Sequence, residues 1–172
     1  MFEFQETGHH RCAMVTVALR RNSELLSTQC ILHTAMIRRR RFHRVVFVAA
    51  GIYNIAWGLY SVYDPQWLFR FSGLPPLNHP AIFACLAMVV GLYGIIYFEV
   101  ARVPERGWLL AAVGLIGKIL GPIGLARLIW TGAWPKSTIV LCLTNDLIWW
   151  IPFTLYLCDA WRFRAGGSEA RP

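Results

Sequence analysis

Long runs of apolar residues dominate the chain from residue 44 onward, and most polar residues lie in the segments between these runs. Four runs occur, at about residues 44–63, 80–100, 107–130 and 137–158. Each is close to the roughly 20 residues that a helix needs to cross a bilayer core. A bilayer offers no hydrogen-bond partners to the backbone, so each run should be helical throughout. The pattern therefore predicts an all-α fold, a four-helix transmembrane bundle with antiparallel neighbours.

The first and second runs are joined by a long connection that is rich in helix breakers. Residues 64–79, DPQWLFRFSGLPPLNH, contain three prolines and one glycine, which argues against a continuous helix. Trp67, Leu68, Phe69 and Phe71 make the segment amphipathic. We expect it to lie along the membrane surface, as short interfacial segments do.

The first 35 residues are mixed in polarity and show no sustained period. Two interpretations are open. The segment is a disordered or surface-lying tail, or it is a spurious extension of a chain that starts at Met36, where MIRRRRFHR leads directly into an apolar run. The pattern thus predicts three parts: this extension at 1–35, a transmembrane domain at 36–160, and a short basic cytoplasmic tail at 161–172.

Composition agrees with a membrane protein, since 56% of the residues are hydrophobic and the mean hydropathy is +0.46. The net charge of +8 could suggest a nucleic-acid-binding protein. However, the basic residues cluster at the edges of the apolar runs, as membrane topology requires. We therefore expect the lipid bilayer as a partner, and no nucleic acid.

The basic residues also indicate the orientation. Ten of them lie on the side of the two termini and of the connection between the second and third runs, against two or three on the other side. The positive-inside rule then predicts a multi-pass protein of the bacterial inner (plasma) membrane with both termini in the cytoplasm. The ten are Arg38, Arg39, Arg40, Arg41, Arg44, Arg102, Arg106, Arg162, Arg164 and Arg171, and the others are Arg70, Lys136 and Arg127.

Lys118, near the middle of the third run, is the most informative single residue. An isolated charge at that depth costs at least about 2.5 kcal/mol, so it should find a partner or become neutral. Asp146, preceded by Asn145, lies at almost the same depth in the fourth run, Asn54 lies near the midpoint of the first, and Tyr93 is one turn from this level. We expect a mid-membrane polar cluster, which either binds a ligand or is a structural ion pair that sets the helix register.

Two prolines lie close to this level. Pro122 removes the helical donor to the carbonyl of Lys118, and Pro152 does the same to Ile148, close to Asp146. Freed carbonyls at mid-depth are tolerated only where protein or water satisfies them. Such broken helices often mark binding cavities in transporters, which favours a binding cavity here.

Small residues recur along the third run. Gly114 and Gly121 are seven residues apart, and so are Gly117 and Gly124. Such spacing places glycines along one side of a helix and predicts close packing against a neighbour. The second run has a similar set, Ala84, Ala87, Gly91 and Gly94.

Other chemistries have weaker support. The five cysteines form no CxxC motif and no pattern with metal-ligand spacing. A haem held between helices needs axial histidines inside the bundle, whereas His43 and His79 lie at the ends of runs. No histidine is placed to activate a serine or cysteine for hydrolysis. We expect no metal, no cofactor and no catalytic residue, and we favour a protein that is not an enzyme.

Three stretches, NIAWG (Asn54–Gly58), GKILGPIG (Gly117–Gly124) and NDLIWWIPF (Asn145–Phe153), resemble a group of small bacterial four-helix membrane proteins without an established function. The resemblance covers about residues 42–157. In size and helix count alone, the chain is also similar to DoxX-type proteins. The resemblance implies a four-helix membrane fold and assigns no catalytic residue.

Three functions are compatible with these features. The first is a membrane protein that binds or transports a small solute, proton or ion at the mid-bilayer site, as a homodimer because four helices are few for a pore. The second is an accessory or scaffold subunit that associates with a heterologous membrane partner. The third, with less support, is a membrane-embedded redox enzyme acting on a lipid or quinone.

Overall fold

The computed structural model describes the backbone of residues 36–168 and the side chains of residues 36–164. The predicted extension at 1–35 and the end of the predicted basic tail lie outside these residues. Within the described part the chain is almost wholly helical and contains no strand, so the predicted all-α fold is confirmed.

Four helical spans are long and apolar enough to cross a membrane, which makes the chain a multi-pass membrane protein. The last span is composite, because it begins with a 3-10 turn and is interrupted by a π-helical segment. The elements are a first helix over Met36–Tyr63, α2 over Trp67–Phe71, α3 over Pro80–Arg102, α4 over Trp108–Trp130, η1 over Lys136–Thr138, α5 over Ile139–Cys142, the π-helical η2 over Leu143–Leu147, and α6 over Ile148–Ser168.

Two spans extend well beyond the apolar runs. The first helix already includes Met36, and α6 continues to Ser168 through residues that the sequence pattern assigned to the tail. Both extensions are rich in arginine, whose long side chain can reach water while its stem covers apolar surface. By contrast, α3 starts where expected because Pro80 occupies its first turn, where no helical donor is needed.

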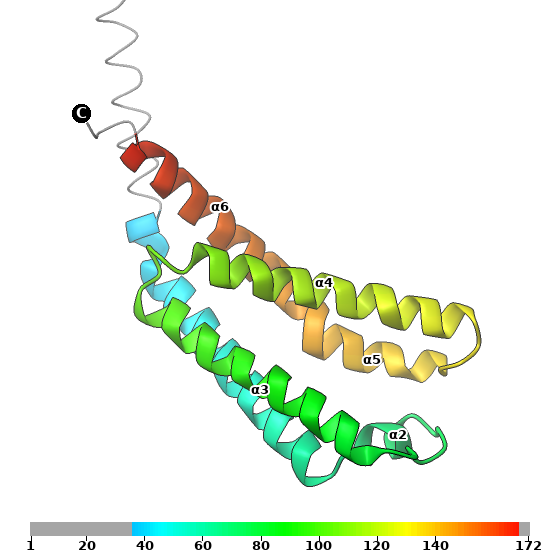
Figure 1. Ribbon diagram of the computed structural model, residues 1–172. Helices are drawn as coiled ribbons and strands as arrows, with labels where there is room; N and C mark the ends of the chain where they lie inside the picture. The colour runs from blue at the N-terminus through cyan, green and yellow to red at the C-terminus, as the bar shows by residue number, and fades with distance from the viewer. Residues whose placement is uncertain (1–35, 169–172) are drawn as a thin grey trace, which may run out of the picture.

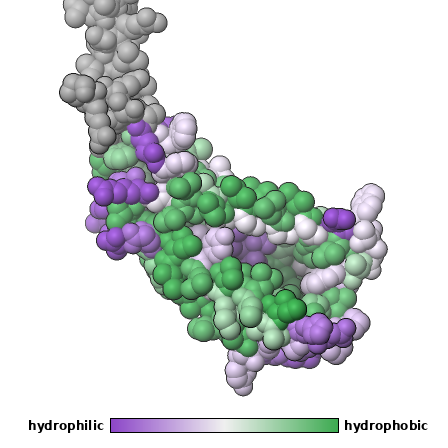
Figure 2. Space-filling model, in the orientation of Figure 1, coloured by the Kyte–Doolittle hydropathy of each residue, from purple (hydrophilic) through white to green (hydrophobic). Residues whose placement is uncertain are grey.

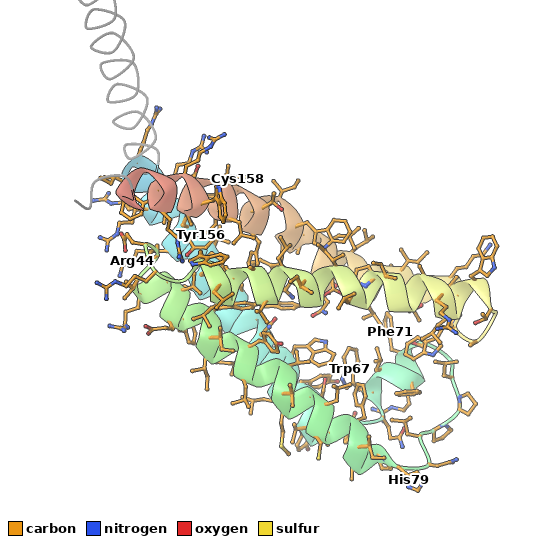
Figure 3. The ribbon with its side chains drawn as sticks, turned by 45° about the horizontal axis from the view of Figure 1, so that its top comes forward. Arg44, Trp67, Phe71, His79, Tyr156 and Cys158 are labelled. Carbon is orange, nitrogen blue, oxygen red and sulfur yellow. The ribbon has the colours of Figure 1, made fainter. Side chains whose placement is uncertain are left out.

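The spans form two helical hairpins that meet at one end and diverge at the other (Figure 1). The first helix pairs with α3, and α4 packs against α6 and η2. Arg44, Tyr156 and Cys158 lie at the end where the hairpins meet, which we call the closed end, whereas Trp67, Phe71 and His79 lie at the opposite, open end (Figure 3).

Stacked aromatic rings fill the core at the closed end. The ring of Phe47 lies 4.6 Å from that of Phe153 and 4.8 Å from that of Tyr156, and Tyr97 meets Phe153 edge to face at 5.1 Å. All four side chains are almost completely buried. This core joins the first helix, α3 and α6, and leaves the open end without a comparable apolar centre.

Glycines bring the first helix and α3 into close contact. A Cβ placed on Gly58 would lie 2.7 Å from Gly91 Cα, and one placed on Gly51 would lie 2.9 Å from the carbonyl oxygen of Gly94. These distances are too short for any real side chain, so only glycine allows this approach. The small residues of the second run therefore pack against the first helix.

The connection between the first helix and α3 covers the open end with aromatic side chains. Trp67 donates its indole N–H to Ser61 Oγ at 2.8 Å, and Phe69 contacts the ring of Phe83 at 5.8 Å and that of Trp134 at 5.6 Å. Trp134 belongs to the loop after α4, so α2 links the two diverging hairpins.

Candidate binding site in the membrane interior

Lys118 lies near the middle of α4 and is 95% buried, with 5% of its surface exposed. Its ammonium group donates a hydrogen bond to the backbone carbonyl of Asn145 at 2.6 Å. The same nitrogen lies 3.9 Å from Asp146 Oδ1, within the range of an ion pair. Two consecutive residues of the last span thus face the one cation in the middle of α4.

The π-helical segment η2 shapes this side of the site. The N–H of Ile148 points to the carbonyl of Leu143, five residues back, instead of four as in an α-helix. A π-turn inserts one extra residue into the helix and is frequent at functional sites. Here it contains Asn145 and Asp146, the two residues that contact Lys118.

The carbonyl that Pro122 frees has a specific partner. Pro122 lies inside α4, so no backbone N–H reaches the carbonyl of Lys118 from the next turn. Instead, the indole of Trp150 in α6 donates to this oxygen at 3.0 Å. Lys118 is therefore held at both ends by the last span, through its ammonium group and through its backbone.

Asp146 has one occupied and one free carboxylate oxygen. Oδ1 accepts a hydrogen bond from Asn145 Nδ2 at 3.0 Å, while no donor of the described residues bonds Oδ2. Oδ2 faces Gly121, where an added Cβ would come within 3.3 Å of it. The absence of a side chain at Gly121 thus leaves room beside the carboxylate.

A cavity of about 170 Å³ adjoins this carboxylate. Asn145 and Asp146 line it together with Gly121, and residues of the open end, Trp57 and Leu68, complete its wall. Figure 2 shows hydrophilic surface at the bottom of a hollow between the hairpins, framed by hydrophobic surface. The site is thus approached from the open end and closed on the other side by the aromatic core.

Two buried polar atoms near Lys118 have no hydrogen-bond partner within the described part of the chain. They are Oδ1 of Asn145 and the indole nitrogen of Trp149, whose ring lies 6.0 Å from the Lys118 ammonium. An unsatisfied buried polar group costs about 1–3 kcal/mol, so such groups are rare without a reason. Asn145 lines the cavity, whereas Trp149 is not among its lining residues.

Two residues of the predicted cluster lie elsewhere. Asn54 is buried, with its backbone carbonyl beside Gly91 of α3. Among the described residues its Oδ1 has no partner, and it makes no hydrogen bond to Lys118 or Asp146. Tyr93 contacts the ring of Tyr97 at 6.4 Å. The structure therefore groups Lys118, Asn145 and Asp146, and leaves Asn54 and Tyr93 out of this group.

The glycines of α4 fall into two sets, according to whether another residue lies close to them. An added Cβ on Gly114 would lie 2.6 Å from the Tyr97 hydroxyl, and Gly121 faces Asp146, so both allow a close approach. Nothing lies within 4 Å of such a Cβ on Gly117 or Gly124. Within the described part of the chain, the glycine-to-glycine contact is made by the first helix and α3, and close packing at Gly117 and Gly124 stays a prediction.

A second polar cluster, at the closed end, was missed by the sequence analysis. His43 Nε2 lies 3.0 Å from Asp159 Oδ2, and both side chains are almost fully buried. Arg39 approaches the same oxygen at 3.4 Å, and Nδ1 of His43 has no hydrogen-bond partner among the residues that the structure describes. The first apolar run begins at residue 44 and the fourth ends at residue 158. His43 and Asp159 each lie one residue beyond these limits, so hydropathy alone placed both outside the bundle.

The described residues offer little for metal or thiol chemistry. They contain no group of three His, Cys, Asp or Glu side chains that could hold a metal ion. Cys85, Cys142 and Cys158 are free thiols.

No family model, curated protein or solved structure shows a significant match to this chain. The site must therefore be interpreted from its own geometry.

Proposed function

We propose that this membrane protein binds a proton, a small ion or a solute of a few heavy atoms at the Lys118–Asp146 site. The observation that carries the proposal is the free Oδ2 of Asp146, an oxygen of a largely buried side chain that lines a cavity together with residues of the open end. Intramembrane ionisable residues that face a cavity commonly mark substrate or ion pathways.

The size of the cavity favours a small ligand. Its volume of about 170 Å³ is below the roughly 300–1,000 Å³ of sites for drug-sized molecules. The pair of Lys118 and Asp146 has no net charge when both are ionised. The free acceptor oxygen of Asp146, Oδ2, therefore favours a cation or a hydrogen-bond donor.

The distribution of basic residues supports a location in a bacterial inner membrane with both termini in the cytoplasm. In this orientation the open end faces away from the cytoplasm, and the ligand enters from that side. Transport across the membrane would then require the aromatic core around Phe47 and Phe153 to separate.

Two measurements on purified protein test the proposal. Native mass spectrometry from nanodiscs should detect a small bound mass, or proteoliposomes loaded with a pH-sensitive dye should show proton flux above empty liposomes. Asp146→Asn should abolish the signal, and Asp64→Asn, at a partly exposed carboxylate in the connection, away from the cavity lining, should preserve it. A protein with neither bound mass nor flux, or an Asp146→Asn variant with unchanged signal, would refute the proposal.

A second candidate is an accessory subunit or a homodimer. The observation in its favour is the open space beside Gly117 and Gly124, which would let a helix of another chain approach α4 closely. Cross-linking from Gly117→Cys in native membranes distinguishes the two forms. A homodimer gives a product of twice the chain mass, and an accessory subunit gives a stable heterologous product.

A further inference from the structure

A larger groove lies between α4 and the start of the last span. Its volume is about 510 Å³, and apolar side chains of α4, α5 and η2 form most of its wall. Lys136 is the only charged side chain among the residues that line it. Representative wall residues are Ala126, Ile129, Ile139, Leu143 and Leu147.

The groove is polar at its mouth and apolar in its interior. Lys136 begins the last span and Trp130 ends α4, so both lie at the ends of spans, where the membrane boundary is expected. From Lys136 the wall continues to Leu147, which is about 16 Å along a helix axis at 1.5 Å per residue. A single lipid acyl chain has this shape, with its polar end at the boundary.

The basic side chains at the open end favour the binding of an anion. Lys136 and Arg127 have no carboxylate within ion-pair distance among the residues that the structure describes. Asp64, the only acidic residue of the connection at 64–79, is already paired with Arg70, and this guanidinium lowers the pKa of the Asp64 carboxyl. The Lys136 ammonium at the mouth of the apolar groove is thus able to pair with the phosphate of a bilayer lipid.

We propose that this groove binds one acyl chain of an anionic phospholipid, whose phosphate pairs with the Lys136 ammonium. The site is separate from the Lys118–Asp146 cavity and does not depend on the function proposed for it. Only Leu125 and Cys142 line both hollows, so the bound chain would lie against the outer side of the cavity wall.

The lipids that the purified protein retains report directly on phospholipid binding in the groove. The protein is placed in nanodiscs that contain equal amounts of phosphatidylglycerol and phosphatidylcholine, released into the gas phase, and its retained lipids are identified by mass. We expect phosphatidylglycerol to be retained roughly fivefold over phosphatidylcholine, the preference that one basic residue confers at an anionic surface. Lys136→Gln should remove the preference. Arg127→Gln, at a cation that does not line the groove, should keep it.

A second variant tests the groove itself. Ala126→Trp places a large ring inside it and should abolish retention of both lipids, while an unchanged melting temperature in detergent shows that the variant is folded. Equal retention of the two lipids by the original protein, or the same preference in Lys136→Gln as in Arg127→Gln, would overturn the proposal. If Ala126→Trp does not fold, the comparison of the two charge variants still decides.

Discussion

At the scale of single residues, several partial contacts together lower the free-energy cost of placing the Lys118 charge in the membrane. Lys118 reaches a carbonyl at 2.6 Å and a carboxylate oxygen at 3.9 Å. The short contact is to the neutral Asn145 backbone, and the ion pair is the longer of the two. This leaves part of the Asp146 carboxylate free, which a purely structural pair would not need.

The coupling of Lys118 and Asp146 is the first prediction. Lys118→Met alone and Asp146→Leu alone should each reduce the free energy of unfolding by roughly 3–5 kcal/mol, because each leaves a buried charge uncompensated. The double variant should recover much of this loss, because it removes both charges. Unfolding of all three variants in mild detergent measures the coupling. A double variant whose loss equals the sum of the single losses would show that the two residues do not interact.

The indole of Trp150 provides the second prediction. Trp150→Phe keeps an aromatic ring but leaves the carbonyl of Lys118 without a donor. The free energy of unfolding should fall by about 1–3 kcal/mol, the cost of an unsatisfied buried acceptor. Trp130→Phe is the matched control, since Trp130 is 89% exposed and should be nearly neutral. Equal losses in both variants would remove any special role for the Trp150 hydrogen bond.

At the scale of elements, two helix pairs are stabilised in different ways. The first helix and α3 approach through Gly58 and Gly91, without side chains between them. The second hairpin contains a proline in α4 and a π-turn in the last span, so it has the irregular backbone that the site requires. Close, regular packing and the polar site are therefore separated between the two hairpins.

Substitution of the glycines gives the third prediction. Gly58→Ala should destabilise the protein by about 1–3 kcal/mol, because its methyl group would overlap Gly91 Cα and strain the pair. Gly117→Ala meets open space and should be neutral or stabilise α4 by about 0.5–1 kcal/mol through helix propensity. Thermal unfolding in detergent compares them. A large loss at Gly117 in membranes, but not in detergent, would instead reveal a partner helix there.

At the scale of the whole molecule, the closed and open ends differ in what joins the spans. Aromatic rings and the His43–Asp159 pair join them at the closed end, whereas α2 covers the open end through single aromatic contacts. The cavity and the groove both lie toward the open end. Ligands are therefore expected to enter from the side of the 64–79 connection.

The orientation of the molecule is the fourth prediction. A reporter that is active only outside the cytoplasm should be silent when fused after Gly167 and active when inserted in the 64–79 connection, because ten basic residues favour a cytoplasmic location for the termini. A reporter active only inside should give the opposite pattern. Activity of the external reporter after Gly167 would contradict the orientation and reverse the proposed side of ligand entry.

The sequence alone determined the helical class and the positions of the spans, because a bilayer of fixed thickness imposes a length and a hydropathy that each span must meet by itself. It also placed Lys118 and Asp146 at matching depths. Depth, however, does not specify which way a helix faces. Asn54 shares that level, yet among the described residues it makes no hydrogen bond to Lys118 or Asp146.

Only the tertiary structure decided which groups meet. Three features depend on helix rotation and on contacts between distant segments. They are the π-turn that holds Asn145 and Asp146, the Trp150 hydrogen bond to the freed carbonyl, and the burial of His43 against Asp159. Hydropathy is a property of one segment at a time and carries no information about these rotations. The packing of four helices against one another determines them together, and with them the cavity beside Asp146.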